Sequence, residues 1–165
     1  MKSKIVYSHN DYWCKHQIYD AIDYGCDMVE ADIIYMNNKI ILSHSWRPFS
    51  FMCYGNLEDN YLKPLSQYCK DNPDKTMWMY VEFKDSNTHI IELLHKLFKQ
   101  YQTKNLLYTV SALGSKWYQK KRYETAMQFY KKYKDEFSLL WKETELEQQY
   151  QVISVDLYPE SIWHF

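Results

Sequence analysis

The chain has 165 residues, a length typical of one domain with a sizeable hydrophobic core. Its 20 Lys and Arg residues nearly balance its 21 Asp and Glu residues, so the net charge of −1 predicts no binding to nucleic acid. With only 3 glycines and neither GxGxxG nor GxxxxGK[ST], the sequence excludes nucleotide binding through a Rossmann turn or a P-loop.

Strands and helices are expected to alternate along the chain. In order we expect a strand at 4–8, a helix at 15–24 ended by Gly25, strands at 28–35 and 39–43 joined by an Asn37-Asn38 turn, a long loop at 45–60, a short helix at 61–70, a strand at 77–83, a helix at 89–101, a strand at 106–110, two charge-rich helices within 116–149 and a strand at 152–157. This alternation favours a single α/β domain, residues 1–165, with mainly parallel strands.

Polar residues stand at the ends of four of the apolar, strand-like runs. They are His9, Glu30 with Asp32, His44, and Glu82 with Lys84. Active sites of α/β barrels lie at the carboxyl ends of the strands, so these residues are candidates for one site. Three carboxylates suit a hard cation, two imidazoles suit an acid/base pair, and a lysine suits an anion.

Each of these signals also has a structural interpretation. Glu30 and Asp32 are two residues apart, which puts both on one face of a strand, and that face is often simply solvated. A histidine at a strand end is often structural. Glu82 interrupts an apolar strand and therefore needs a partner, which a salt bridge to Lys84 would supply as well as a cation would.

The order and spacing of the motifs are more specific than any single residue. The segments SHNDYW (8–13), YGCDMVEAD (24–32), SHS (43–45) and VEFKD (81–85) resemble the phospholipase-C-like phosphodiesterases, which include glycerophosphodiester phosphodiesterases and venom sphingomyelinase D enzymes. They are most similar to the subgroup named after a fungal protein of mitochondrial inheritance. The resemblance covers residues 4–85, and residues 86–165 diverge.

The resemblance implies a TIM-barrel-like fold and a metal-dependent phosphodiester hydrolase acting on a glycerophosphodiester or a lysophospholipid. By resemblance, one Mg²⁺ or Ca²⁺ ion would be bound by Glu30, Asp32 and Glu82, His9 and His44 would form the acid/base pair, and Lys84 and Asn10 would bind the phosphate. Two further candidates are Asp156, near the end of the last strand, and Trp46, on a loop of the active face.

The chain is short for this fold, because a complete (β/α)₈ barrel needs about 250 residues. We therefore expect an incomplete barrel whose open edge is covered by the helices of 116–149 or by a partner chain. A competing hypothesis is a noncatalytic protein that binds metal or phosphate. A multinuclear, histidine-rich metallohydrolase is the third, but His16, His89, His95 and His164 are scattered and no HxH motif occurs.

The remaining sequence features concern location and surface contacts. Neither a signal-peptide core nor a membrane-length apolar run occurs, so a cytoplasmic location is expected. The loop aromatics, Tyr12, Trp13, Trp46, Phe49 and Phe51, are expected to pack as a loop core, the alternative being peripheral membrane contact. The basic stretch 116–134 is expected to be a solvated helix face rather than a contact for an anionic surface. The four cysteines are expected to be free thiols, with a Cys53–Cys69 bridge as the alternative.

Overall fold

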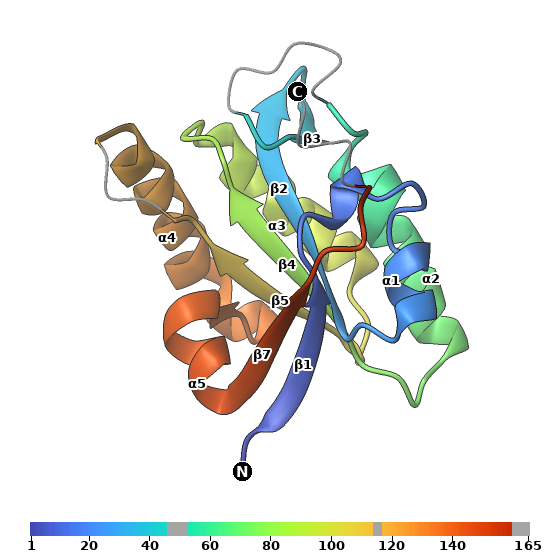
Figure 1. Ribbon diagram of the computed structural model, residues 1–165. Coiled ribbons are helices and arrows are strands. Elements are labelled where there is room, and N and C mark those ends of the chain that lie inside the picture. The colour runs from blue at the N-terminus through green and yellow to red at the C-terminus, as the bar shows by residue number, and fades with distance from the viewer. Residues whose placement is uncertain (46–52, 114–116, 160–165) are drawn as a thin grey trace.

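The computed structural model describes residues 1–45, 53–113 and 117–159, and within these ranges seven strands form one sheet (Figure 1). The strands are β1 (Ser3–Ser8), β2 (Met28–Met36), β3 (Lys39–Leu42), β4 (Met77–Phe83), β5 (Leu106–Ser111), β6 (Leu140–Trp141) and β7 (Tyr150–Val155). Their order is β6-β5-β4-β2-β1-β7, and β3 pairs with β2. Every pairing is parallel except the β2–β3 hairpin, so the expected α/β class is confirmed.

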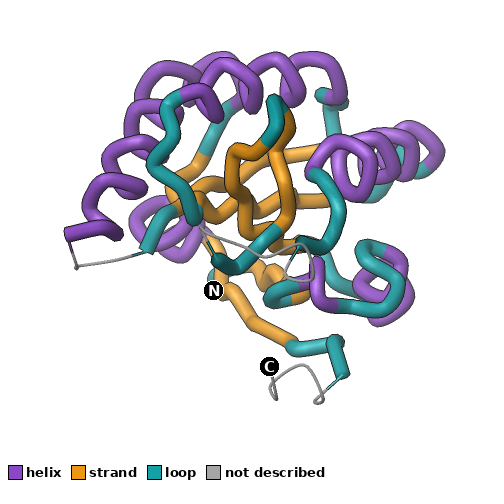
Figure 2. The backbone as a smooth tube through the Cα atoms, turned by 90° about the horizontal axis from the view of Figure 1, so that it is seen from above, coloured by secondary structure: helices purple, strands orange, loops and turns teal. Residues whose placement is uncertain are grey.

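Helices cover the outer face of this sheet (Figure 2). They are α1 (Tyr19–Tyr24), α2 (Lys63–Asp71), α3 (His89–Tyr101) and α4 (Trp117–Phe137), with a 3₁₀ turn η1 (Asp11–Trp13) and a π-helical turn η3 (Glu58–Leu62). Alternate strand residues such as Ala31 and Val81 are fully buried in one core with Leu94 of α3 and Phe129 of α4. This alternation leaves the other residues of β2 and β4 to face inward.

The inner face of the sheet has a smaller core of its own. Tyr7, Met28 and Tyr80 are buried there together with Ile5 and Trp78, all on alternate positions of β1, β2 and β4. The next inward positions toward the carboxyl ends of these strands are His9, Glu30 and Glu82. The inner face is therefore apolar at its base, and its polar residues lie above that base.

The sheet curls into a half-barrel, and β6 and β7 are its two ends. The chain between them forms η4 (Lys142–Leu146), a π-helical turn, and the short helix α5 (Glu147–Gln149). Leu146 is fully buried in the inner core, and the ammonium of Lys142 lies 5.4 Å and 5.2 Å from the ring centroids of Tyr7 and Tyr80. This segment of 116–149 therefore covers part of the inner face.

Several sequence-based boundaries were wrong. The helix expected at 15–24 begins only at Tyr19. Of the two helices expected within 116–149, the first is the long helix α4 and the second is the short helical stretch of η4 and α5. Between them Ser138 adopts a left-handed φ of 51° and the chain returns to pair β6 with β5, a strand that was not predicted. The loop expected at 45–60 already forms η3 from Glu58, and the last strand is β7, which ends just before Asp156.

Other local predictions held. Gly25 ends α1 with a φ of 94° and donates its N–H to the carbonyls of Ala21 and Ile22. Cys53 and Cys69 are free thiols, as are Cys14 and Cys26, so the alternative bridge does not form. Within the described ranges, no helix combines the length and apolarity needed to span a membrane.

Candidate active site

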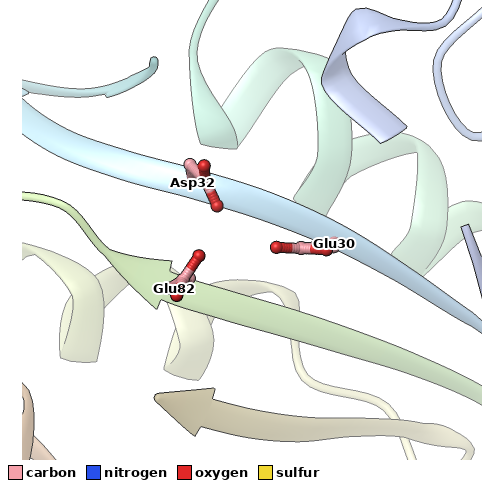
Figure 3. A group of neighbouring side chains, drawn as sticks. All are labelled: Glu30, Asp32 and Glu82. Carbon is pink, nitrogen blue, oxygen red and sulfur yellow. The ribbon is translucent and has the colours of Figure 1, made fainter. Parts of the chain in front are cut away.

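Three buried carboxylates meet on the neighbouring strands β2 and β4, where Glu82 lies near the carboxyl end of β4 (Figure 3). Glu30 and Asp32 come from β2, and the parallel register sets Glu82 of β4 directly beside Asp32. One oxygen from each side chain lies within 4.8 Å of the others, and the three residues are 3%, 0% and 4% exposed. The solvated-face interpretation of Glu30 and Asp32 is therefore wrong, because the curl of the sheet buries that face.

The three carboxylates repel one another in this buried position. Burial, followed by the charges of Asp32 and Glu82, raises the pKa of Glu30 well above its usual value. Burial and the charge of Asp32 raise the pKa of Glu82 to about 7. For Asp32 burial acts in the same direction, but the hydrogen bond from His44 and the charge of Lys84 outweigh it and lower the pKa. A positive charge among these groups would stabilise their ionised forms.

Lys84 supplies one positive charge at the edge of the triad. Its Nζ is 3.0 Å from Oε2 of Glu82 and 3.7 Å from Oδ2 of Asp32. Burial lowers the pKa of Lys84, but the two carboxylates outweigh burial and raise it overall. The salt bridge expected as the structural interpretation of Glu82 is thus present, and it leaves the other oxygen of Glu82 for a further partner.

Two oxygens of the triad are buried without a hydrogen-bond partner among the described residues: Oδ1 of Asp32 and Oε1 of Glu82. An unsatisfied carboxylate oxygen is costly to bury, and a divalent cation bound by oxygen ligands removes that cost. The donor set contains only carboxylates, which fits a hard cation such as Mg²⁺ or Ca²⁺ and does not choose between them.

His44 lies beside Asp32, just beyond the end of β3. Its Nδ1 is 2.8 Å from Oδ2 of Asp32, and the hydroxyl of Tyr12 donates to the same oxygen at 2.5 Å. The His44 side chain is 57% exposed, whereas Asp32 is fully buried. The carboxylate therefore favours a proton on Nδ1 and leaves Nε2 of His44 as the ring atom available for chemistry.

His9 occupies the other side of the triad, just beyond the end of β1. Its Nε2 is 3.9 Å from Oε2 of Glu30, and its Nδ1 is 2.8 Å from Oδ1 of Asp156, the residue that follows β7. Each of the two candidate histidines thus has a carboxylate at Nδ1. The structure places both rings next to the acidic triad and brings Asp156 to the same site.

Asn10 is 4% exposed and adopts a left-handed conformation with a φ of 49°. Its backbone N–H donates to Oε2 of Glu30 at 3.2 Å, and its side-chain oxygen accepts the hydroxyl of Tyr12 at 3.1 Å. Asn10 therefore orders the triad directly. Trp46, the other loop candidate, lies outside the described residues, as do Phe49 and Phe51.

Two residues of η1 have a structural importance that the sequence pattern did not indicate. Tyr12 is fully buried, as the loop-core interpretation predicted, but its hydroxyl also contacts Asp32, Asn10 and His44. Asp11 is fully buried and accepts hydrogen bonds from the hydroxyls of Ser8 and Tyr61 and from the N–H of Ile18. The only available signal was their position directly after a candidate catalytic histidine.

The remaining described histidines lie apart from the triad. His16 pairs with Asp20 at 3.2 Å, and His95 pairs with Glu136 at 2.9 Å. Among the described residues, the acidic triad is the group of three or more His, Cys, Asp or Glu side chains arranged to hold a metal ion. This arrangement does not match a multinuclear, histidine-rich centre. His164 lies outside the described residues.

Comparison with known proteins finds similarity to the same family that the motifs indicated. The chain is 26% identical to altered inheritance of mitochondria protein 6 of Saccharomyces cerevisiae and 29% identical to the protein of the same name from Zygosaccharomyces rouxii. Each match covers 62% of this chain, which spans only 30% of the relative's length. No solved structure matches. Residues 1–72 match the model of the AIM6-like phosphodiesterase domain, so the predicted family resemblance is confirmed.

Proposed function

We propose that this protein is a metal-dependent phosphodiester hydrolase acting on a glycerophosphodiester or lysophospholipid-type substrate. The observation that carries the proposal is the buried triad with its two unpartnered oxygens, flanked on opposite sides by His9 and His44. The match of residues 1–72 to a phosphodiesterase domain supports the reaction class. The substrate class comes from the wider superfamily that the motifs resemble.

Each group of residues has a task in the proposed reaction. Glu30, Asp32 and Glu82 would hold one divalent cation, which neutralises charge on the phosphate when bound. Lys84 borders the triad and would neutralise charge on a nonbridging oxygen. Asn10 would donate a hydrogen bond to the phosphate from its amide nitrogen, because its amide oxygen faces the hydroxyl of Tyr12.

The two histidines would divide the proton transfers. One ring would attack phosphorus or take the proton of the attacking hydroxyl or water, and the other would protonate the leaving oxygen. In both rings Nδ1 faces a carboxylate, so Nε2 is the atom that would exchange the proton. A histidine pair suits this task because the ordinary pKa of imidazole lies near neutral pH.

A noncatalytic role is the second candidate, and the open half-barrel favours it. Among the described residues β6 and β7 do not pair with each other, so the sheet is open between them. Such a protein would bind a cation and a phosphate group without turnover. A second chain over the open edge, or a lipid surface, would supply the missing cover, and a cytoplasmic location fits either candidate.

Turnover by the purified chain separates the two candidates. Glycerophosphodiesters and lysophospholipids would be screened with Mg²⁺ or Ca²⁺ and with EDTA, using wild type, His9→Ala, His44→Ala and Glu30→Gln. His16→Ala is the matched control, because His16 also pairs with an aspartate but lies apart from the triad. We expect turnover in wild type and the control alone. Cation binding without turnover by a folded wild type would instead establish the noncatalytic role.

A further inference from the structure

We propose that Asp156 is a positioning residue that holds the ring of His9 with Nδ1 turned away from the site and Nε2 turned toward Glu30. The effect of this positioning on turnover rests on the proposed function, whereas the orientation of the His9 ring can be tested independently of that function. Asp156 lies in the divergent half of the chain, far outside residues 1–72 that match the family domain.

The strand pairing of β1 with β7 brings the two residues together. Their parallel register runs from Ser3 opposite Tyr150 to Ser8 opposite Val155. The pairing continues one step further, because the N–H of His9 donates to the carbonyl of Val155 at 2.9 Å. Asp156 is therefore placed beside His9 by backbone hydrogen bonds, although 147 positions separate them in the sequence.

The side-chain contacts of His9 distinguish its two ring nitrogens. Oδ1 of Asp156 is 2.8 Å from Nδ1 of His9, and the opposite ring nitrogen, Nε2, is 3.9 Å from Oε2 of Glu30. A carboxylate accepts only, so this contact favours the proton on Nδ1 and a free electron pair on Nε2. The ring of Tyr7 packs edge-on against the same imidazole at 6.2 Å and limits its rotation.

The segment that carries Asp156 is itself anchored. Tyr158, two residues on, is 6% exposed and packs edge-on against Trp13 with ring centroids 5.2 Å apart. Trp13 in turn lies 5.4 Å from the ring of His44. The backbone around Asp156 is thus held on both sides, by β1 before it and by η1 after it.

Asp156 differs from the carboxylate beside the other histidine. Asp32, which contacts His44, belongs to the triad and would share its charge with a bound cation. Asp156 does not belong to that triad, so its carboxylate stays available to His9 when the triad is filled. Its side chain is 54% exposed, so we expect an orienting effect of moderate size.

The ring tautomer of His9 tests the positioning directly. Nitrogen-15 NMR of the histidine rings would be recorded on wild type, Asp156→Ala and Asp156→Asn at a pH well above the usual pKa of histidine. We expect His9 in wild type to carry its proton on Nδ1, and Asp156→Ala to shift the ring to the Nε2-protonated form. Asp156→Asn keeps an acceptor and should retain most of the wild-type tautomer. An unchanged His9 spectrum in Asp156→Ala would overturn the proposal.

Kinetics give a second readout once a substrate is found. We expect Asp156→Ala to lower kcat by about 10- to 100-fold, the range for losing a residue that orients a catalytic ligand, with KM changed by less than about twofold. Asp20→Ala is the matched control, because Asp20 makes the same kind of contact to His16, 3.2 Å away, outside the site. If Asp156→Ala changes the tautomer of His9 but the wild type shows no turnover, the positioning is supported and the proposed enzymatic function is refuted. A normal kcat in Asp156→Ala would refute the consequence of this positioning for turnover.

Discussion

Cation binding should stabilise this protein more at high pH than at low pH. The physical reason is Glu82, whose pKa is raised from 4.5 to about 7 by burial and by the charge of Asp32. Between these two values the folded, metal-free protein keeps a proton that the unfolded chain has released. The stability of the metal-free protein therefore falls as the pH rises through this window, and the lost stability is not regained above it.

The size of this effect follows from the two pKa values. The difference between 4.5 and about 7 corresponds to roughly 3 kcal/mol, an upper figure for a carboxylate that is 4% exposed. At about pH 5.5 a cation must first displace the proton from Glu82, which costs about 2 kcal/mol, whereas at about pH 8 it does not. For a domain of this size, that difference corresponds to roughly 4–8 °C in Tm.

Thermal unfolding followed by tryptophan fluorescence would measure this difference. Wild type would be compared with Mg²⁺, with Ca²⁺ and with EDTA at both pH values, and Glu30→Gln would be run beside it. The matched control is Glu92→Gln, because Glu92 is an exposed glutamate of α3 that pairs with Lys132 and lies in no metal-binding group. We expect the cation-dependent gain to vanish in Glu30→Gln and to persist in Glu92→Gln. An equal gain at both pH values, or a full gain in Glu30→Gln, would refute the assignment of the cation to this triad.

Three further substitutions test the structure around the site, each by urea unfolding. Leu146→Ala should lower the free energy of unfolding by about 2–4 kcal/mol, because Leu146 is fully buried in the inner core. Leu113→Ala, at a position that is 55% exposed, should leave it almost unchanged. Equal losses in the two variants would show that η4 does not cover the inner face. Tyr12→Phe should cost about 1–3 kcal/mol through the lost hydrogen bonds to Asp32 and Asn10, and a neutral result would contradict that network. Lys84→Met should lower the free energy of unfolding by about 3–5 kcal/mol near neutral pH, because it leaves buried carboxylates unpaired. Added Mg²⁺ should restore part of this stability. A loss below about 1 kcal/mol would argue against the ion pair between Lys84 and Glu82.

The acidic triad could be predicted because its geometry is nearly independent of the rest of the fold. Residues that are two positions apart on one strand point to the same face of the sheet, and neighbouring parallel strands have their carboxyl ends at the same edge. These two rules made Glu30, Asp32 and Glu82 candidates for one site, and the family resemblance indicated that they would bind one cation together. The sequence also located His9 and His44 at strand ends, although the rules alone do not say which way an imidazole turns.

The contacts that depend on the curl of the sheet could not be predicted in the same way. The hydrogen bond between Asp156 and His9 requires that β7 pair with β1, and no local pattern encodes that partner. The burial of Asp11 and Tyr12 depends on Tyr61 and Asp32, which are distant in sequence. β6 has only two residues, too few for any periodicity to indicate a strand.

The opening of the half-barrel lies away from the strands of the acidic triad. The candidate residues lie on β2 and β4 or directly after β1, β3, β4 and β7. The strands β4, β2, β1 and β7 are consecutive in the sheet, and β3 pairs with β2. The opening lies between β6 and β7, and Leu146 and Lys142 cover the inner core there. The groups proposed for chemistry are therefore supported by intact strand pairs, whereas the walls that would enclose a substrate are reduced. An open half-barrel should bind a substrate more weakly than a closed one while keeping the geometry of the groups proposed for chemistry, so screening at high substrate concentration is the appropriate search for activity.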